Sequence, residues 1–157
     1  MRAVVQRVRS ASVHVAEQQV AAIAQGLAVL VGVGHDDRPE DGERLAQKIL
    51  ALRIFDDDRG KLHRTVLDAG GSVLVVPQFT LYGDVRRGRR PDFAHAAPPE
   101  IGRRLFEGFC GALRGGGATV GQGTFGASMR VQLECDGPVT IVMSTDGWAE
   151  GDLGRKP

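Results

Sequence analysis

Two short apolar runs constrain the fold of this chain more than any other feature. Residues 27–33 (Leu-Ala-Val-Leu-Val-Gly-Val) and residues 72–76 (Ser-Val-Leu-Val-Val) are almost continuously apolar. A run of this length without alternation is typical of a strand buried on both faces, and it is far shorter than the roughly 20 residues that span a bilayer. We therefore expect two buried strands in one domain, because 157 residues leave little room for a second.

Two amphipathic helices are expected around these strands. Residues 39–54 carry apolar side chains at helical spacing and begin with Pro39, and we expect Asp36 or Asp37 to cap this helix. The second helix is expected over residues 98–113, before a run of glycines. Further strands are expected over residues 2–8, 11–15, 18–24, 129–134 and 139–143. This order of elements predicts an α+β fold, not an alternating parallel α/β fold.

Composition narrows the class of protein. The 42% of hydrophobic and 25% of charged residues are ordinary for a soluble globular protein. Gln6 and Arg7 interrupt the apolar stretch at the N-terminus too early for a signal peptide. We therefore expect a cytoplasmic location. The two cysteines, Cys110 and Cys135, form no CxxC pair and are expected to be buried, and the four histidines are scattered. We therefore expect no metal and no cofactor.

One segment of the chain is strongly basic although the whole chain is nearly neutral. The net charge of +1 argues against a wide nucleic-acid surface, and no DNA or membrane partner is expected. However, four arginines gather within five positions: Arg86, Arg87, Arg89 and Arg90. Such a cluster can contact several phosphates, although a solvated loop is an equally good interpretation.

Two segments could carry chemistry. Gln78, Phe79 and Thr80 follow the end of a buried strand, where backbone N–H groups can converge on a developing oxyanion. No His or Lys lies in this segment to activate Thr80, so we expect a hydrogen-bonding or structural role for that hydroxyl. The second segment is Gly-Pro at residues 137 and 138, which a simple turn would also explain.

Together these segments resemble the D-aminoacyl-tRNA deacylase family. The likeness covers roughly residues 1–143, including the opening Met-Arg-Ala-Val-Val-Gln-Arg-Val and the Gly-Arg-Arg-Pro of the middle loop. Two motifs stand in the family's order, Gln-Phe-Thr at residues 78–80 and Gly-Pro-Val-Thr at residues 137–140. The resemblance implies an α+β fold with mostly antiparallel, curved, barrel-like sheets and two main helices. Residues 1–143 would form the deacylase domain. Residues 144–157 are expected to form a flexible tail, because the segment after Ser144 is rich in glycine and charged residues.

The resemblance also implies a function in translation quality control. The chain would be a carboxylic ester hydrolase that cleaves D-aminoacyl-tRNA, and glycyl-tRNA mischarged on tRNA-Ala, without a cofactor. Backbone donors around Gln78, Phe79 and Thr80 would hold the carbonyl oxygen, and the tRNA's own 2′-hydroxyl would help to activate water. In a homodimer, a cis Gly-Pro from one subunit would project into the partner's pocket and exclude L side chains.

Further residue roles follow from the same likeness. The chiral filter would consist of Gly137, Pro138, Val139 and Thr140, with Arg7 bracing it and Met129 near the pocket. The arginine loop, Arg86, Arg87, Arg89 and Arg90, would contact the single-stranded acceptor end of tRNA.

Two departures from the family pattern leave an alternative open. Pro77 replaces the usual Ser before the Gln, and Cys135 replaces the usual Asn before the Gly-Pro. A sister branch of animal deacylases with a looser chiral filter also carries Pro-Gln, whereas the Gly-Pro-Val-Thr resembles the strict, D-selective type. The alternative is a non-catalytic or relaxed-specificity tRNA-binding or editing module.

Overall fold

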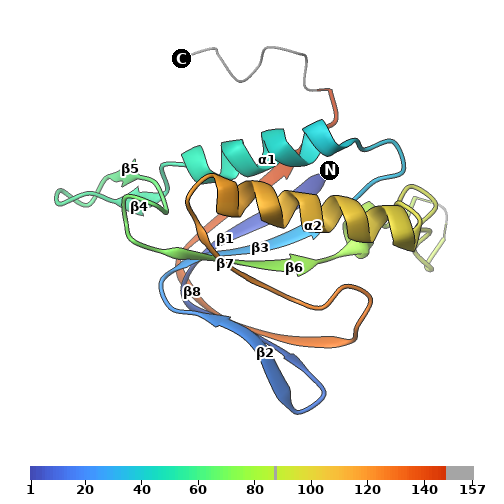
Figure 1. Ribbon diagram of the computed structural model, residues 1–157, viewed down its shortest axis with the longest axis horizontal. Helices are drawn as coiled ribbons and strands as arrows, with labels where there is room; N and C mark the ends of the chain where they lie inside the picture. Colours follow the sequence, from blue (N-terminus) through green and yellow to red (C-terminus); the bar gives the residue numbers. More distant parts are fainter. Residues whose placement is uncertain (87, 148–157) are drawn as a thin grey trace.

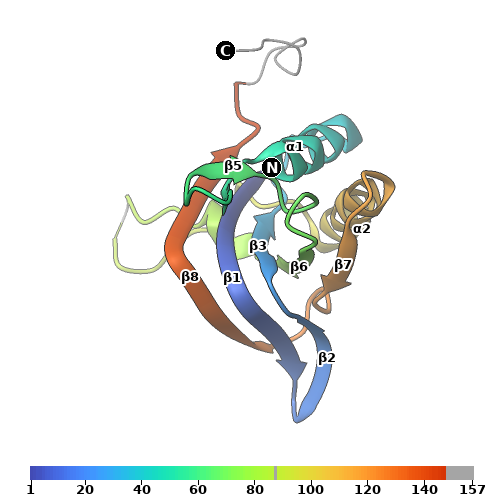
Figure 2. The ribbon, with the colours of Figure 1, turned by 90° about the vertical axis from the view of Figure 1, so that its left-hand side faces the viewer.

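A long curved strand organises the sheet in the computed structural model, which describes residues 1–86 and 88–147. This strand, β1 (Arg2–Val15), pairs antiparallel with β8 (Met129–Ser144) along its whole length. On its other side it pairs with β3 (Gly26–Gly32) along the first half and with β2 (Gln18–Ile23) along the second half. Figure 2 shows β1 and β8 bending together as one curved arm.

The sheet is mixed, and both helices lie on one of its faces. β6 (Ser72–Pro77) runs parallel to β3, and β7 (Thr119–Gln122) runs parallel to β6. The helices α1 (Pro39–Ala51) and α2 (Pro99–Gly115) lie side by side over this part of the sheet (Figure 1). A small hairpin of β4 (Phe55–Asp56) and β5 (Leu62–Arg64) stands apart. The expected α+β fold with a curved, barrel-like sheet is confirmed.

Both faces of the two central strands are buried, as their apolar sequences predict. Val29, Val73 and Val75 face the helices and belong to the main core with residues such as Ile49 and Phe109. The opposite face of the same strands contacts the inner side of the curved arm. That second cluster contains Val8, Ala11, Val13, Ala28, Leu74 and Val76. Burial on both faces is therefore the reason that these strands lack alternation.

The first helix differs from the prediction at both ends. It ends at Ala51, not at residue 54, because Leu52 is extended (φ −62°, ψ 121°) and the chain turns into β4. Its N-cap is Arg38, not Asp36 or Asp37, and the Asp41 carboxylate accepts the Arg38 backbone N–H at 2.9 Å. The aspartates before a helix do not identify its cap when tertiary contacts compete for them.

The number of strands also differs from the prediction. Residues 2–8 and 11–15 form one strand, and residues 129–134 and 139–143 form another. Shifts in register near Val8, opposite Cys135, allow each strand to bend without a break. The polar residues that interrupt the apolar alternation therefore mark shifts in register within a strand, not the ends of strands.

The cysteines and the C-terminal region complete the comparison. Cys110 is buried as expected, but Cys135 is exposed, because it lies where β8 bends away from the core. β8 ends at Ser144, and Thr145 is buried against the N-terminus, while residues 148–157 of the expected tail lie outside the described residues. Among the described residues, neither helix combines the length and apolarity that crossing a membrane requires.

Candidate active site

The end of β6 leads directly into a short 3-10 turn, η1 (Phe79–Tyr82). The backbone N–H of Gln78 still pairs with the sheet and donates to the Val31 carbonyl at 2.8 Å. Pro77 fits at this strand end because pairing with β7 stops opposite Val75, so its missing N–H breaks no hydrogen bond of the ladder. Phe79 and Thr80 stand at the start of this turn, where backbone N–H groups have no acceptor within the turn itself.

A cavity of about 740 Å³ lies beside this turn. Three of its lining residues come from the strand end, Pro77, Gln78 and Phe79, and Met129 comes from the start of β8. Phe79 is 58% exposed, and the centroid of its ring lies 5.1 Å from that of Phe93 in an edge-to-face arrangement. The remaining lining residues are His35, Val76, Phe93, Ala94, Ala96, Ala97, Pro98, Pro99, Phe125, Gly126, Ala127 and Val131.

The hydroxyl of Thr80 is occupied by a neighbour. Thr80 is exposed, and its Oγ1 accepts a hydrogen bond from the Gln78 side-chain amide. An amide cannot take the hydroxyl proton, so this contact orients Thr80 without activating it as a nucleophile. His35 lines the same cavity and faces Asp36 at 3.3 Å. The sequence did not identify His35, because it follows a buried strand at a distance from every motif.

The Gly-Pro motif lies at the bend of β8, and its peptide bond is cis. Gly137 has φ +118°, and a Cβ there would lie 2.9 Å from Cγ2 of Val139 and 3.3 Å from Nη2 of Arg7. Thr140 donates from its hydroxyl to the Gln6 side chain, and Val139 packs against the main core. The motif is therefore held tightly by its own chain while Gly137 and Pro138 stay exposed.

Arg7 is the buried residue that ties this bend to the rest of the domain. Its Nε donates to the Asp136 carbonyl at 3.2 Å, and its Nη1 donates to the Ile54 carbonyl at 2.8 Å. It also pairs with the carboxylates of Asp136 at 3.2 Å and Asp56 at 3.3 Å. The side chain of Arg7 is 7% exposed, whereas the side chains of Asp56 and Asp136 are 49% and 32% exposed.

The two predicted groups of residues are separate within one chain. Gln78, Phe79 and Met129 line the cavity together, whereas Arg7 and residues 137–140 are not among its described lining residues. Sequence reasoning missed the wall formed by Phe93, Ala96 and Phe125 because these residues come from distant loops without a recognisable motif.

The arginines of the middle loop differ in their surroundings. Arg86 pairs with Asp84 through contacts of 2.5–3.0 Å, and hydrogen bonds from Arg86 hold the pKa of that carboxyl well below its usual range. Arg89 and Arg90 are exposed, and Arg87 lies outside the described residues. Across residues 1–86 and 88–147, no group of three or more His, Cys, Asp or Glu residues could hold a metal ion.

An α+β domain with a curved mixed sheet and an apolar cavity at a strand end has close structural counterparts. It superposes with a TM-score of 0.88 on a solved structure titled "c-Myc DNA Unwinding Element Binding Protein", at 40% identity, covering 92% of this chain and 99% of that one. A structure described as a probable eukaryotic D-amino acid tRNA deacylase matches with a TM-score of 0.77 at 20% identity, which shows the fold alone.

The sequence relationship gives the family. The profile described as D-Tyr-tRNA(Tyr) deacylase matches residues 4–144. D-aminoacyl-tRNA deacylases of Thermotoga petrophila and Roseiflexus sp. are 56% and 54% identical over 145 residues, covering 92% of this chain and 97% and 94% of theirs. The chain belongs to the D-Tyr-tRNA(Tyr) deacylase family.

Proposed function

We propose that this protein hydrolyses the ester bond of D-aminoacyl-tRNA and releases the free D-amino acid and tRNA. The observation that carries the proposal is the cavity beside η1, which brings Gln78 and Phe79 of the first motif together with Met129. An apolar pocket with a few polar groups at one end is typical of a small-ligand site. Membership of the deacylase family supplies the reaction class.

The catalytic contribution of the chain is electrostatic. The backbone N–H groups of Phe79 and Thr80 stabilise the oxyanion that forms when water attacks the ester carbonyl. The side chain of Gln78 fixes Thr80, and the substrate's own 2′-hydroxyl assists the attacking water. Such a site needs no nucleophilic side chain, which agrees with a Thr80 hydroxyl that faces an amide.

Chirality is selected by a second copy of the chain. Gly137 and Pro138 of one protomer enter the partner's cavity, where their backbone leaves no room for an L side chain. This arrangement is supported by the position of the motif, which is exposed and does not line its own cavity. A glycyl ester, including glycyl-tRNA mischarged on tRNA-Ala, carries no side chain to reject and would also be hydrolysed.

The strand that carries the motif has the surface of an interface. Within the described residues β8 pairs with β1 alone, which leaves its other edge open. Val142 and Leu133 on this strand are 79% and 39% exposed. An open edge with exposed apolar side chains favours association, and we therefore assign β8 to the homodimer contact. Arg89 and Arg90 contact tRNA phosphates, and the protein acts in the cytoplasm.

The direct test compares D-Tyr-tRNA, L-Tyr-tRNA and glycyl-tRNA as substrates. We expect rapid release from the D and glycyl forms, and release from the L form no faster than without protein. Sedimentation at the same concentration should give the mass of a dimer. Equal rates for the D and L forms would support the relaxed-specificity alternative, and no release from any of them would exclude the hydrolase.

A further inference from the structure

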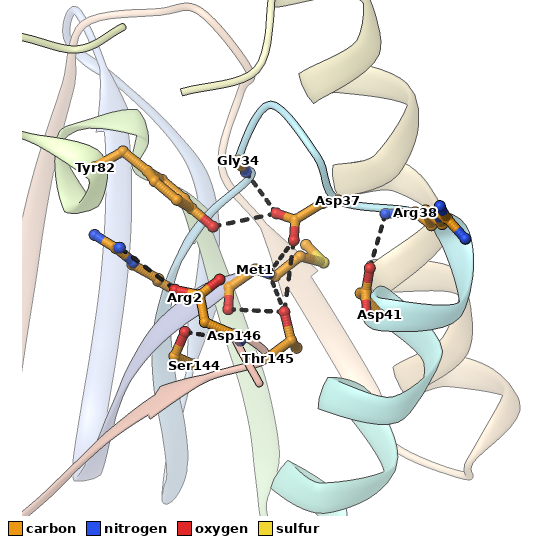
Figure 3. Close-up of polar contacts among 10 residues, drawn as sticks. All are labelled: Met1, Arg2, Gly34, Asp37, Arg38, Asp41, Tyr82, Ser144, Thr145 and Asp146. Carbon is orange, nitrogen blue, oxygen red and sulfur yellow. Dashed lines mark hydrogen bonds and ion pairs between the residues drawn. The ribbon is translucent and has the colours of Figure 1, made fainter. Parts of the chain in front are cut away.

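The α-amino group of Met1 lies inside the domain. The residue has no exposed surface, and its amino group donates to the carboxylate of Asp37 and to the hydroxyl of Thr145 (Figure 3). The side chain of Asp37 is itself 8% exposed. A charge in such a place is tolerated only when it is paired and hydrogen-bonded. A free ammonium group satisfies both conditions here.

Asp37 links the Met1 amino group to the turn that borders the cavity. The second oxygen of its carboxylate accepts the hydroxyl of Tyr82 at 3.2 Å and the backbone N–H of Gly34 at 2.5 Å. Tyr82 is the last residue of η1, whose first residues are Phe79 and Thr80. Burial, reinforced by the Asp37 charge, raises the pKa of Tyr82, so its phenol stays protonated and donates the hydrogen bond.

Arg2 holds the same end of η1 from the other side. Its guanidinium lies 4.4 Å from the centre of the Tyr82 ring, and its Nη1 donates to the Leu81 carbonyl at 3.1 Å. Arg2 therefore contacts the last two residues of η1 directly, whereas Met1 is linked to Tyr82 through Asp37.

Two glycines pack closely against the turn that ends at Tyr82. A Cβ on Gly34 would lie 2.6 Å from the Tyr82 hydroxyl, and a Cβ on Gly32 would lie 2.8 Å from the Gln78 carbonyl oxygen. Asp37 also holds Gly34, which is bridged to Ala96 of the cavity wall. Displacement of Asp37 would consequently reach two sides of the cavity.

We propose that the free α-amino group of Met1 is a positioning group for the active site, acting through Asp37 and Tyr82 on the Phe79–Tyr82 turn. A formyl group, an acetyl group or additional residues on this nitrogen would remove its charge and place atoms where no exposed space exists. The protein then reaches full activity only when this amine is unblocked. The inference rests on the proposed deacylase function.

The experiment compares four proteins: the unmodified chain, a version with Gly-Ser added before Met1, Tyr82→Phe and the control Asp41→Asn. Asp41 is a neighbouring acid that caps α1 and contacts no part of η1 (Figure 3). For each we would measure kcat and KM on D-Tyr-tRNA, thermal unfolding, and hydrogen exchange in the peptide spanning residues 78–83.

We expect the extension and Tyr82→Phe to lower kcat by about tenfold with little change in KM, because small displacements of a catalytic group can cost up to about 100-fold. Exchange in residues 78–83 should become faster in both, while Asp41→Asn keeps the kcat of the unmodified chain. If the extended chain does not fold, kcat and hydrogen exchange of Tyr82→Phe test the inference instead.

Unchanged kcat and unchanged exchange in the extended chain would overturn the inference, as would an equal loss of kcat in Asp41→Asn. An unmodified chain that releases no amino acid would instead refute the proposed function. The exchange measurement would still report whether the amine positions the turn.

Discussion

Replacement of Arg7 by methionine should destabilise the domain and loosen the bend that carries Gly137. Methionine keeps the apolar stem but removes the donors to the Ile54 and Asp136 carbonyls. Hydrogen bonds from a charged group contribute about 1.5–3 kcal/mol each. The half-exposed carboxylates of Asp56 and Asp136 can return to water, so their pairs add at most about 1 kcal/mol each.

The cost of burying a guanidinium offsets part of this sum. That penalty is several kcal/mol, and methionine does not incur it. We therefore expect Arg7→Met to lower the free energy of unfolding by about 2–3 kcal/mol. For a chain of this size that corresponds to a Tm lower by roughly 4–12 °C.

The measurement is urea unfolding at fixed protein concentration, because the proposed dimer would make stability depend on concentration. Arg9→Met is the matched control. Arg9 contacts the same Asp136 at 3.4 Å but is 70% exposed, so its loss should change stability by less than about 0.5 kcal/mol. The reasoning is refuted if Arg7→Met unfolds with the same midpoint as the wild type, or if Arg9→Met is equally destabilised.

Four further predictions concern the site residues and the two cysteines. Thr80→Ala should keep kcat within about threefold in single-turnover assays, because backbone groups stabilise the oxyanion; a trapped acyl-enzyme in the wild type would reverse this assignment. Gly137→Ala should slow deacylation of D-Tyr-tRNA, because the residue has φ +118° and its Cβ would meet Val139, whereas unchanged kinetics would argue against the filter. Replacing Arg89 and Arg90 together by alanine should raise KM. It should also reduce the slope of the logarithm of the tRNA binding constant against the logarithm of salt concentration by roughly 1.4. Arg86→Ala should change both quantities less, because Arg86 is paired with Asp84. Burial raises the pKa of the Cys110 thiol to about 11, so iodoacetamide at pH 8 should label only Cys135 in the native protein; mass spectrometry that finds equal labelling would contradict this.

The sequence was a good guide where burial alone determines structure. Val29 and Val75 are buried on strands that the apolar runs identify, and the helical stripes locate both helices. The sequence was a poor guide where contacts between residues far apart in the chain determine the structure. The early end of α1 and the diversion of Asp37 from a cap to the Met1 amine depend on tertiary contacts that no local pattern records.

The same distinction applies to the site. Gln78 and Phe79 were identifiable because they form a motif, and they do line the cavity. Phe93 and Phe125 complete its wall from loops far away in the sequence, and each in isolation is an ordinary core aromatic. The pairing of Arg86 with Asp84 was not predicted either, although the two residues are only two positions apart and the Asp84 carboxylate also accepts the Arg86 backbone N–H.

Complementation between two inactive variants tests the cross-subunit site most directly. Ala127→Trp would fill the cavity of its own protomer, because Ala127 lines that cavity. In the proposed dimer, Gly137→Val would distort the Gly-Pro that enters the partner's cavity, because even a Cβ at this position meets Val139. In a mixed dimer one site would combine an intact cavity with an intact Gly-Pro, so refolding the two variants together should restore about a quarter of the wild-type rate per site. Mixtures that form mixed dimers yet stay as inactive as either variant alone would show that the motif does not serve the neighbouring cavity.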